Sequence, residues 1–414
     1  MKKSLFLVMV ILSLLLLSSL VLATPQTVPN GPWVQPEQTV QLQKFYTIEE
    51  LGKKLLDIEA HSKGRLRVEE AGYSATLGYP IYVAKFGEPD ENKIRVFIQS
   101  SMHGDEQIHT NSCVELIQTL ATSSNKDVLE ILDKITIWIV PMLNPDGNMS
   151  EVDGKIWPKR RNTQTWDPTA WGLAANFVAP FYYGSTNGVF GFDLNRDFNP
   201  NLDFVLNPNT NILPRGSSSQ SGFLVTPEAR TVTALFKALQ PDAFIDLHMQ
   251  YPTYAMGTED NGMNTLQMLA VVLRGTSYTD RDGNTYTVDS EVLKLSKQMA
   301  SLVYLKLTEN GNSPYGNIGR YAPINYPGSA LGAFQLNGTA ITLFEFRGGS
   351  IYDSGQKASG MLIAQCVEGL RIILMGFVTG EVYDIDPAIY DNVIPSSGPL
   401  VENPHPDPRD LPVP

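Results

Sequence analysis

The sequence has few cysteines and few basic residues, and each shortage excludes a class of protein. Two cysteines in 414 residues cannot form a disulfide scaffold, and the sequence leaves open whether Cys113 and Cys366 are two buried thiols or one bridge. Lysine and arginine total 31 against 43 acidic residues, which gives a formal net charge of −12. An acidic surface of that size repels nucleic acid and anionic membranes, so we expect no nucleic-acid partner.

Long apolar runs are also missing, apart from one at the N-terminus. Lys2 and Lys3 precede an apolar stretch over residues 5–22, and the small residue Ala23 ends it as in a cleavage site. No cysteine follows, which argues against a bacterial lipoprotein. The pattern predicts a signal peptide over residues 1–23, secretion to the extracellular space or periplasm, and no membrane attachment after cleavage. The alternative is an uncleaved anchor, because the run is close to the length that spans a bilayer.

The rest of the chain has an ordinary globular composition, with 43% hydrophobic residues, and shows no internal repeat. Residues 24–45 are polar and rich in Pro and Gln, and predict a flexible lead. Residues 381–414 contain many prolines and predict an extended Pro-rich C-terminal tail. Between them, residues 46–380 are long enough for one large domain, which we expect to be monomeric.

Helical and strand patterns alternate along residues 46–380. Apolar periodicity and capping signals predict helices over residues 48–60, 107–120, 292–305 and 361–377, and one beginning at Thr226. Apolar and alternating runs predict strands over residues 94–99, 135–140, 243–249 and 340–346. This alternation predicts an α/β fold. In such folds, functional sites form at the carboxyl ends of the strands.

Candidate metal ligands follow two of these strands. His103 and Glu106 come just after the strand at 94–99, and His248 lies late in the strand at 243–249. An HxxE pair alone is a common coincidence, and a histidine in a buried strand is often a hydrogen-bonded core residue. Together, however, the three residues supply the two imidazoles and one carboxylate of a catalytic zinc site with its fourth position open.

A third strand carries a candidate base. Glu345 lies among Leu343, Phe344 and Phe346, and an apolar run does not bury a carboxylate without a partner. A zinc ion lowers the pKa of a water molecule and polarises a carbonyl, and Glu345 is available to take the proton. This combination predicts hydrolysis of peptide bonds.

Two polar clusters offer groups for binding a substrate. Lys159-Arg160-Arg161-Asn162 can supply positive charge to a tetrahedral oxyanion, and the alternative is a solvated basic loop. In Asp193-Leu194-Asn195-Arg196, an Arg fork beside an Asn amide suits capture of a carboxylate, and the alternative is a structural Asp–Arg pair.

These motifs, in this order over about residues 46–376, resemble the carboxypeptidase A-like family of zinc metallocarboxypeptidases. The matching pieces are the HxxE pair, the turn Asn144-Pro145-Asp146-Gly147, the segment Asp193–Arg196, His248, and Phe344-Glu345-Phe346-Arg347. The resemblance implies a single catalytic domain over residues 46–380 with a mixed, twisted central sheet flanked by helices.

The resemblance also implies a role for each motif residue. One Zn²⁺ would bind to His103, Glu106 and His248, and Glu345 would be the general base. The terminal carboxylate of the substrate would be held by Asn195 and Arg196. Asp193 would contact His103 without binding the metal and would orient its ring. Tyr326 in Tyr326-Pro327 would close over the substrate.

Two departures from the family pattern affect these assignments. The family reads Trp-Arg-Lys-x-Arg with the last Arg serving the oxyanion, whereas this chain reads Trp157-Pro158-Lys159-Arg160-Arg161. The spacing assigns the role to Arg161, with Arg160 as the alternative. Members that prefer basic terminal residues carry an acid after Gly-Ser, but the segment Gly328–Gly332 has none, which favours apolar or aromatic terminal residues.

One further motif suggests a second metal. Asp280 to Asn284, with Glu291 at the twelfth position, resembles a calcium loop, but Thr285 replaces the usual Gly at the sixth position. The flanking β-rich residues favour a hairpin with an Asp-Gly turn, so Ca²⁺ is the weaker interpretation.

The sequence therefore predicts a secreted zinc exopeptidase that removes residues from the C termini of peptides or proteins. Two alternatives stay open. One is a peptidase that cuts γ-D-glutamyl bonds in cell-wall muropeptides, and the other is a secreted non-catalytic binding protein with a silent site.

Overall fold

The computed structural model describes residues 45–152, 154–177, 179, 181–184, 190–209, 219–250, 253–255, 264–309, 317–322, 324–347 and 356–400. The expected signal peptide and lead lie outside these residues, apart from Phe45, which is buried.

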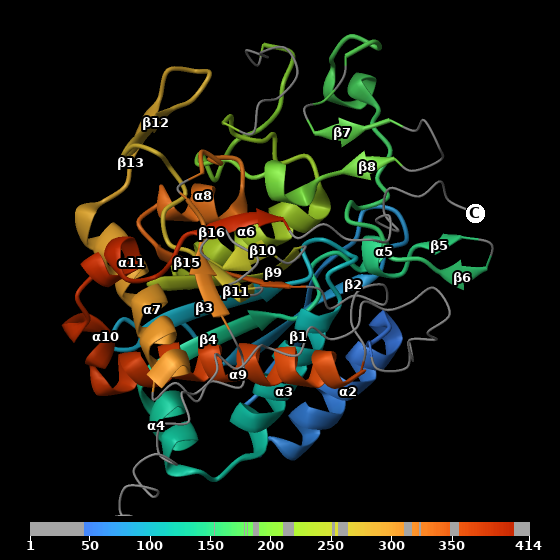
Figure 1. Ribbon diagram of the computed structural model, residues 1–414. Coiled ribbons are helices and arrows are strands. Elements are labelled where there is room, and N and C mark those ends of the chain that lie inside the picture. The colour runs from blue at the N-terminus through green and yellow to red at the C-terminus, as the bar shows by residue number, and fades with distance from the viewer. Residues whose placement is uncertain are drawn as a thin grey trace, which may run out of the picture.

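An eight-stranded mixed sheet forms the centre of the domain, in the order β1-β2-β4-β3-β9-β15-β11-β14 (Figure 1). Strands β4, β3, β9 and β15 run parallel, and the strands outside them on either side, β2 and β11, are antiparallel to their inner neighbours. The strands span Arg67–Tyr73 (β1), Pro80–Phe86 (β2), Ile94–Ser100 (β3), Ile135–Val140 (β4), Ala243–Gln250 (β9), Asn264–Leu269 (β11), Asn317–Arg320 (β14) and Ala340–Arg347 (β15). The predicted α/β fold with a mixed central sheet is confirmed.

Helices cover both faces of this sheet (Figure 1). One apolar layer contains residues of α2, α3, α4, α7 and α9, and a second contains residues of α6 and α8. Alternate side chains of β4 reach opposite layers, Ile137 the first and Trp138 the second, as expected for a central strand. The helices span Ile48–His61 (α2), Ile108–Thr122 (α3), Lys126–Lys134 (α4), Pro145–Asn148 (α5), Pro227–Leu239 (α6), Ser290–Thr308 (α7), Ala330–Gln335 (α8), Gln356–Thr379 (α9), Glu381–Asp384 (α10) and Ala388–Asn392 (α11).

The long helix α9 precedes α10 and α11 and has a markedly apolar composition. Its segment Ser359–Thr379 is long and apolar enough to cross a membrane, but 61% of the most apolar window is buried inside the protein, where α9 packs on α3 and α7. Such burial is typical of a core helix. Cys366 on α9 and Cys113 on α3 are both buried free thiols in this structure.

The segment after α9 corrects the prediction of an extended tail from residue 381. Residues 381–400 form α10, α11 and the strand β16 (Ser397–Leu400), which pairs with β10 (Thr253–Ala255). Tyr390 is buried and its hydroxyl accepts a hydrogen bond from the Ala270 backbone at 3.1 Å. Arg320 of β14 donates to the Ile394 carbonyl. Despite its prolines, this segment is therefore attached to the domain by buried side chains and hydrogen bonds. Residues 401–414 lie outside the described part of the chain.

Several connections outside the central sheet contain short two-stranded hairpins. Asp280 lies in the turn of a hairpin between β12 (Ser277–Thr279) and β13 (Thr285–Thr287), where its carboxylate accepts hydrogen bonds from the backbone N–H groups of Asp282 and Asn284. This is the hairpin alternative to the calcium loop, and Ca²⁺ binding stays a prediction. The other two-stranded pairs are β5 (Glu151–Val152) with β6 (Lys155–Ile156) and β7 (Tyr182–Tyr183) with β8 (Gly191–Phe192).

Helix α6 carries a buried carboxylate whose ionisation should affect stability. Glu228 accepts hydrogen bonds from the Ala75 backbone at 3.1 Å and from Asn162 Nδ2 at 3.3 Å. Burial raises the pKa of Glu228 from 4.5 to about 7, although hydrogen bonds from backbone N–H groups oppose the rise. The folded protein therefore holds this proton more tightly than the unfolded chain. Its contribution to stability is complete below the unfolded pKa and is lost as the pH rises through about 7.

We therefore expect Glu228→Gln to gain stability relative to the unmodified protein as the pH rises. The free energy of unfolding of the variant minus that of the unmodified protein should rise by about 3 kcal/mol between about pH 4 and pH 8. This follows from the rise in the pKa of Glu228 from 4.5 to about 7, because one pKa unit corresponds to about 1.4 kcal/mol. Urea unfolding of both proteins at several pH values measures it. Glu115→Gln, at an exposed site on α3, is the control. A pH-independent difference for Glu228→Gln would contradict the prediction.

Candidate active site

The loop after β3 brings His103 and Glu106 together. Ser101 adopts a left-handed conformation with φ of 51°, and the Glu106 N–H donates to the His103 carbonyl at 3.1 Å, which closes a tight turn. A Cβ atom on Gly104 would lie 2.2 Å from the backbone of Gly147 in the Asn-Pro-Asp-Gly turn, so only glycine fits there. The two motifs of the sequence thus pack directly on each other and hold the HxxE loop.

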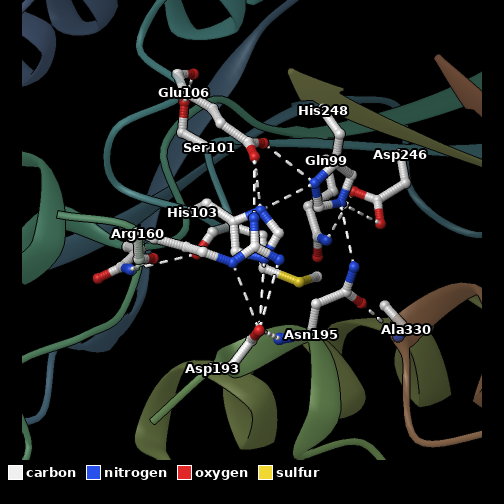
Figure 2. Close-up of polar contacts among 12 residues, drawn as sticks. Gln99, Ser101, His103, Glu106, Arg160, Asp193, Asn195, Asp246, His248 and Ala330 are labelled. Carbon is white, nitrogen blue, oxygen red and sulfur yellow. Dashed lines mark hydrogen bonds and ion pairs between the residues drawn. The ribbon is translucent and has the colours of Figure 1, made fainter. Parts of the chain in front are cut away.

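Strand β9 brings His248 to the same point (Figure 2). His103 Nδ1 lies 2.7 Å from Glu106 Oε1, and His248 Nδ1 lies 3.0 Å from Glu106 Oε2. The two Nδ1 atoms are 3.1 Å apart. One ligand atom from each of the three residues fits within 4.8 Å of the others, and all three side chains are buried.

This donor set fits a divalent cation. Two imidazole nitrogens that face each other at 3.1 Å beside a buried carboxylate place three lone pairs around one point. Burial would raise the pKa of Glu106, but the histidines outweigh it and hold that pKa well below its usual value. Two His nitrogens and one Glu oxygen are a common set for zinc with an open fourth position.

Glu345 lies beside this cluster because of strand register. Strand β15 pairs with β9 so that Glu345 is the partner of His248. Burial raises the pKa of Glu345 to about 7, with Glu106 adding to the rise and His248 opposing it. A carboxylate with a pKa near neutrality is suited to accept and return a proton.

The cluster opens into a cavity of about 350 Å³. Its lining combines the two histidines of the metal-ligand candidates and Glu345 with cationic, polar, aromatic and aliphatic side chains: His103, Arg160, Asn195, Arg196, His248, Met249, Gln250, Tyr321, Ile324, Tyr326, Ser329, Leu331, Leu343 and Glu345. Of the site residues singled out from the sequence, Glu106, Arg161 and Asp193 are not in this lining.

The two arginines of the basic segment point in different directions. The backbone is held by hydrogen bonds from Gly104 N–H to the Arg160 carbonyl and from Lys159 N–H to the Gly147 carbonyl. Arg160 faces the cavity, with its guanidinium 3.6 Å from Glu106 and 3.4 Å from Asp193. Arg161 instead lies over the ring of Tyr183, 3.5 Å from its centroid. Of the two candidates, Arg160 therefore lies beside the metal-ligand residues and Arg161 does not, and the oxyanion role stays a prediction.

The short 3-10 helix η3 (Leu194–Arg196) presents the carboxylate-binding candidates. The Ala330 N–H donates to Asn195 Oδ1 at 3.2 Å, which turns the Asn195 amide nitrogen toward His248. The Arg196 guanidinium lies 4.2 Å above the ring of Tyr326, in cation–π contact. Tyr326 therefore lies directly against the guanidinium that is the candidate for holding a terminal carboxylate.

Asp193, at the start of η3, contacts His103 from the side away from the metal-ligand candidates. Its Oδ1 is 3.3 Å from His103 Nε2, and Arg160 lies against its other oxygen. Burial would raise the pKa of Asp193, but Arg160 and His103 hold it well below the usual range. This is the position expected of a carboxylate that orients His103.

Sequence reasoning missed two residues of the site. Asp246 contacts His248, and the signal was present, because residues two apart on a strand lie on the same face. Tyr321 lines the cavity after β14, and no sequence pattern pointed to it. His109 on α3 is buried against Phe346, and burial lowers its pKa to about 4.

Comparison with known proteins agrees with this geometry. The profile of the zinc carboxypeptidase family matches residues 53–321, which is more than half of the chain. The chain belongs to the zinc carboxypeptidase family. The match includes the HxxE pair, Arg160, Asn195, Arg196 and His248; Tyr326 and Glu345 lie beyond its end.

Individual relatives of this family member are distant. Mast cell carboxypeptidase A of Homo sapiens is 27% identical over 162 residues, covering 38% of this chain and 33% of the relative. Carboxypeptidase B of Homo sapiens is 26% identical over 223 residues, covering 50% of this chain and 49% of the relative. The chain thus spans between a third and a half of these curated relatives.

The fold matches more completely than the sequence. The crystal structure of carboxypeptidase A from Helicoverpa armigera superimposes with a TM-score of 0.52, at 18% identity, over 80% of this chain and 74% of that one. This likeness establishes the common fold.

Proposed function

We propose that this zinc carboxypeptidase family member is an exported exopeptidase that hydrolyses the C-terminal peptide bond of peptides or proteins. The observation that carries the proposal is the arrangement of one cavity. His103, His248 and Glu345 line it together with Asn195 and Arg196, whose donors suit a free carboxylate, and Glu106 contacts both histidines. A peptide whose terminal carboxylate is held there has its last peptide bond near the metal-ligand candidates.

Each residue then has a distinct task. Bound zinc would supply Lewis-acid polarisation of the scissile carbonyl and lower the pKa of a water molecule. Glu345 accepts the proton of the attacking water and delivers it to the leaving amine. Arg160 places positive charge beside the developing oxyanion. Asn195 and Arg196 hold the terminal carboxylate, with the ring of Tyr326 against the Arg196 guanidinium, which orients the bond for attack.

The cavity also supports a preference for apolar or aromatic terminal side chains. Met249, Ile324, Leu331 and Leu343 line it, and Glu345 is the acid among its described lining residues. With Glu345 engaged in proton transfer, the described lining has no second carboxylate to pair with a basic side chain. Export rests on the predicted signal peptide over residues 1–23, and action as a monomer stays a prediction.

Two measurements on the full chain test this function. A chelator should abolish hydrolysis of a blocked dipeptide and zinc should restore it, because the chemistry needs the metal. Amidating the C-terminus of the substrate should lower kcat/KM by about 10²-fold or more, since Arg196 loses a charged, hydrogen-bonded partner worth several kcal/mol. Full activity on amidated peptides would rule out an exopeptidase.

A substrate panel separates the remaining alternatives. Blocked dipeptides ending in Phe, Leu, Lys or Glu should be cleaved with Phe and Leu preferred. A preference for muropeptides with γ-D-glutamyl bonds would instead identify a cell-wall peptidase. Zinc binding without turnover on any of these substrates would identify a binding protein.

A further inference from the structure

Asp246 is a buried carboxylate of the site that the proposed function leaves without a task. It lies two residues before His248 on β9, so both side chains project from the same face of the strand. Asp246 Oδ2 is 3.0 Å from His248 Nε2, and both side chains are almost completely buried (Figure 2). The contact is on the edge of the imidazole opposite to the nitrogen that faces Glu106 and His103.

This contact selects one tautomer of His248. A neutral imidazole carries its proton on one nitrogen and a lone pair on the other. An ionised carboxylate only accepts hydrogen bonds, so Asp246 favours the proton on Nε2. The lone pair is then on Nδ1, which is 3.0 Å from Glu106 and 3.1 Å from His103 Nδ1. Asp246 thus prepares Nδ1 to bind a metal.

A neighbouring strand holds Asp246 in place. Gln99 of β3 pairs with Asp246 of β9, and Gln99 Nε2 donates to Asp246 Oδ1 at 3.0 Å. The carboxylate therefore has one oxygen fixed by Gln99 and the other directed at His248. Asp193, which contacts His103 in the same way, shares its charge with Arg160, whereas Gln99 is neutral.

Asn195 offers His248 the opposite arrangement. Its amide nitrogen lies 3.5 Å from His248 Nε2, and an amide N–H favours a lone pair on Nε2 and a proton on Nδ1. The carboxylate oxygen of Asp246 is closer to Nε2, at 3.0 Å against 3.5 Å for the Asn195 amide, so the contact with Asp246 prevails. If Asn replaced Asp246, its amide and that of Asn195 could both donate to Nε2 of His248. They would then favour the tautomer with the proton on Nδ1, which cannot bind a metal through Nδ1.

We propose that Asp246 is a positioning residue that keeps His248 in its metal-binding tautomer and strengthens zinc binding. This inference rests on the proposed zinc site. It assigns Asp246 no contact with substrate.

Zinc affinity of the full chain, measured by competition with a chromogenic chelator, tests the role without any substrate. Asp246→Asn preserves shape and the bond from Gln99 but places an amide donor against Nε2. We expect its zinc dissociation constant to rise by about 10- to 100-fold, the usual effect of losing such a carboxylate. The Co²⁺-loaded variant should also show a shifted visible absorption spectrum.

Asp242→Asn is the matched control. Asp242 immediately precedes the same strand but pairs with Arg95, outside the site. Its zinc affinity should stay within about twofold of the unmodified protein, since no metal-ligand candidate contacts it. Equal zinc affinities for Asp246→Asn and the unmodified protein would overturn the inference. Failure of the unmodified protein to bind zinc would overturn the proposed function as well, so the two failures are distinguishable.

A measurement on the unmodified protein decides the matter if Asp246→Asn does not fold. The chain has only five histidines, so ¹⁵N-histidine labelling gives a spectrum that can be assigned. In the zinc-loaded protein, His248 should carry its proton on Nε2, with that proton protected from exchange with water. A proton on Nδ1, or rapid exchange at Nε2, would overturn the inference.

Discussion

Glu345→Gln is expected to lower kcat by about 10³-fold while the protein still binds one zinc ion. The amide has nearly the same shape as the carboxylate but cannot accept the proton of the attacking water, and general-base catalysis is worth about 10²- to 10⁴-fold. Glu345 is not one of the three metal-ligand candidates, so zinc content should not change. Steady-state hydrolysis of a blocked dipeptide and metal analysis of the same sample give both quantities.

The control for this variant is Glu115→Gln, the same chemical change at an exposed position on α3. It should retain full activity. A Glu345→Gln protein that keeps both zinc and turnover would show that another group takes the proton. Loss of zinc together with activity would indicate that Glu345 is needed to assemble the site, and a separate base would then have to be sought.

The α/β fold was predictable from the alternation of strand and helix patterns. The convergence of the metal-ligand candidates was predictable because they lie at the ends of these strands. His103, Glu106, His248 and Glu345 lie late in or just after buried strands, and parallel neighbours in a sheet bring their carboxyl ends together. The order of the strands follows from long-range pairing and could be expected here only through the family resemblance. That resemblance predicted a mixed sheet, which the structure contains.

Side-chain direction in loops was not predictable in the same way. Counting from Trp157 assigned the oxyanion role to Arg161, yet Arg160 contacts Glu106 and Asp193, whereas Arg161 lies over Tyr183. Which of the two faces inward depends on backbone bonds to Gly104 and Gly147, which are remote in the sequence. Likewise, the prolines after residue 381 suggested a tail, while burial of Tyr390 and Ile394 depends on neighbours such as Ala270 and Arg320.

Arg160→Met is therefore expected to lower kcat by about 10²- to 10³-fold, the usual effect of removing one oxyanion donor. Arg161→Met is the matched control, with the same change of charge and shape one residue away. It should change kcat by less than about threefold, because a partly exposed cation stacked on Tyr183 contributes about 1 kcal/mol or less. Both are measured with the same blocked dipeptide at saturating concentration.

Zinc content must be measured for both arginine variants, because Arg160 also lies against Glu106 and Asp193. If Arg160→Met retains zinc but loses turnover, the guanidinium acts on the oxyanion. Arg160→Lys should then recover part of kcat, since it restores the charge without the planar fork. A larger loss for Arg161→Met than for Arg160→Met would return the role to Arg161, and would mean that the basic segment changes its path when substrate binds.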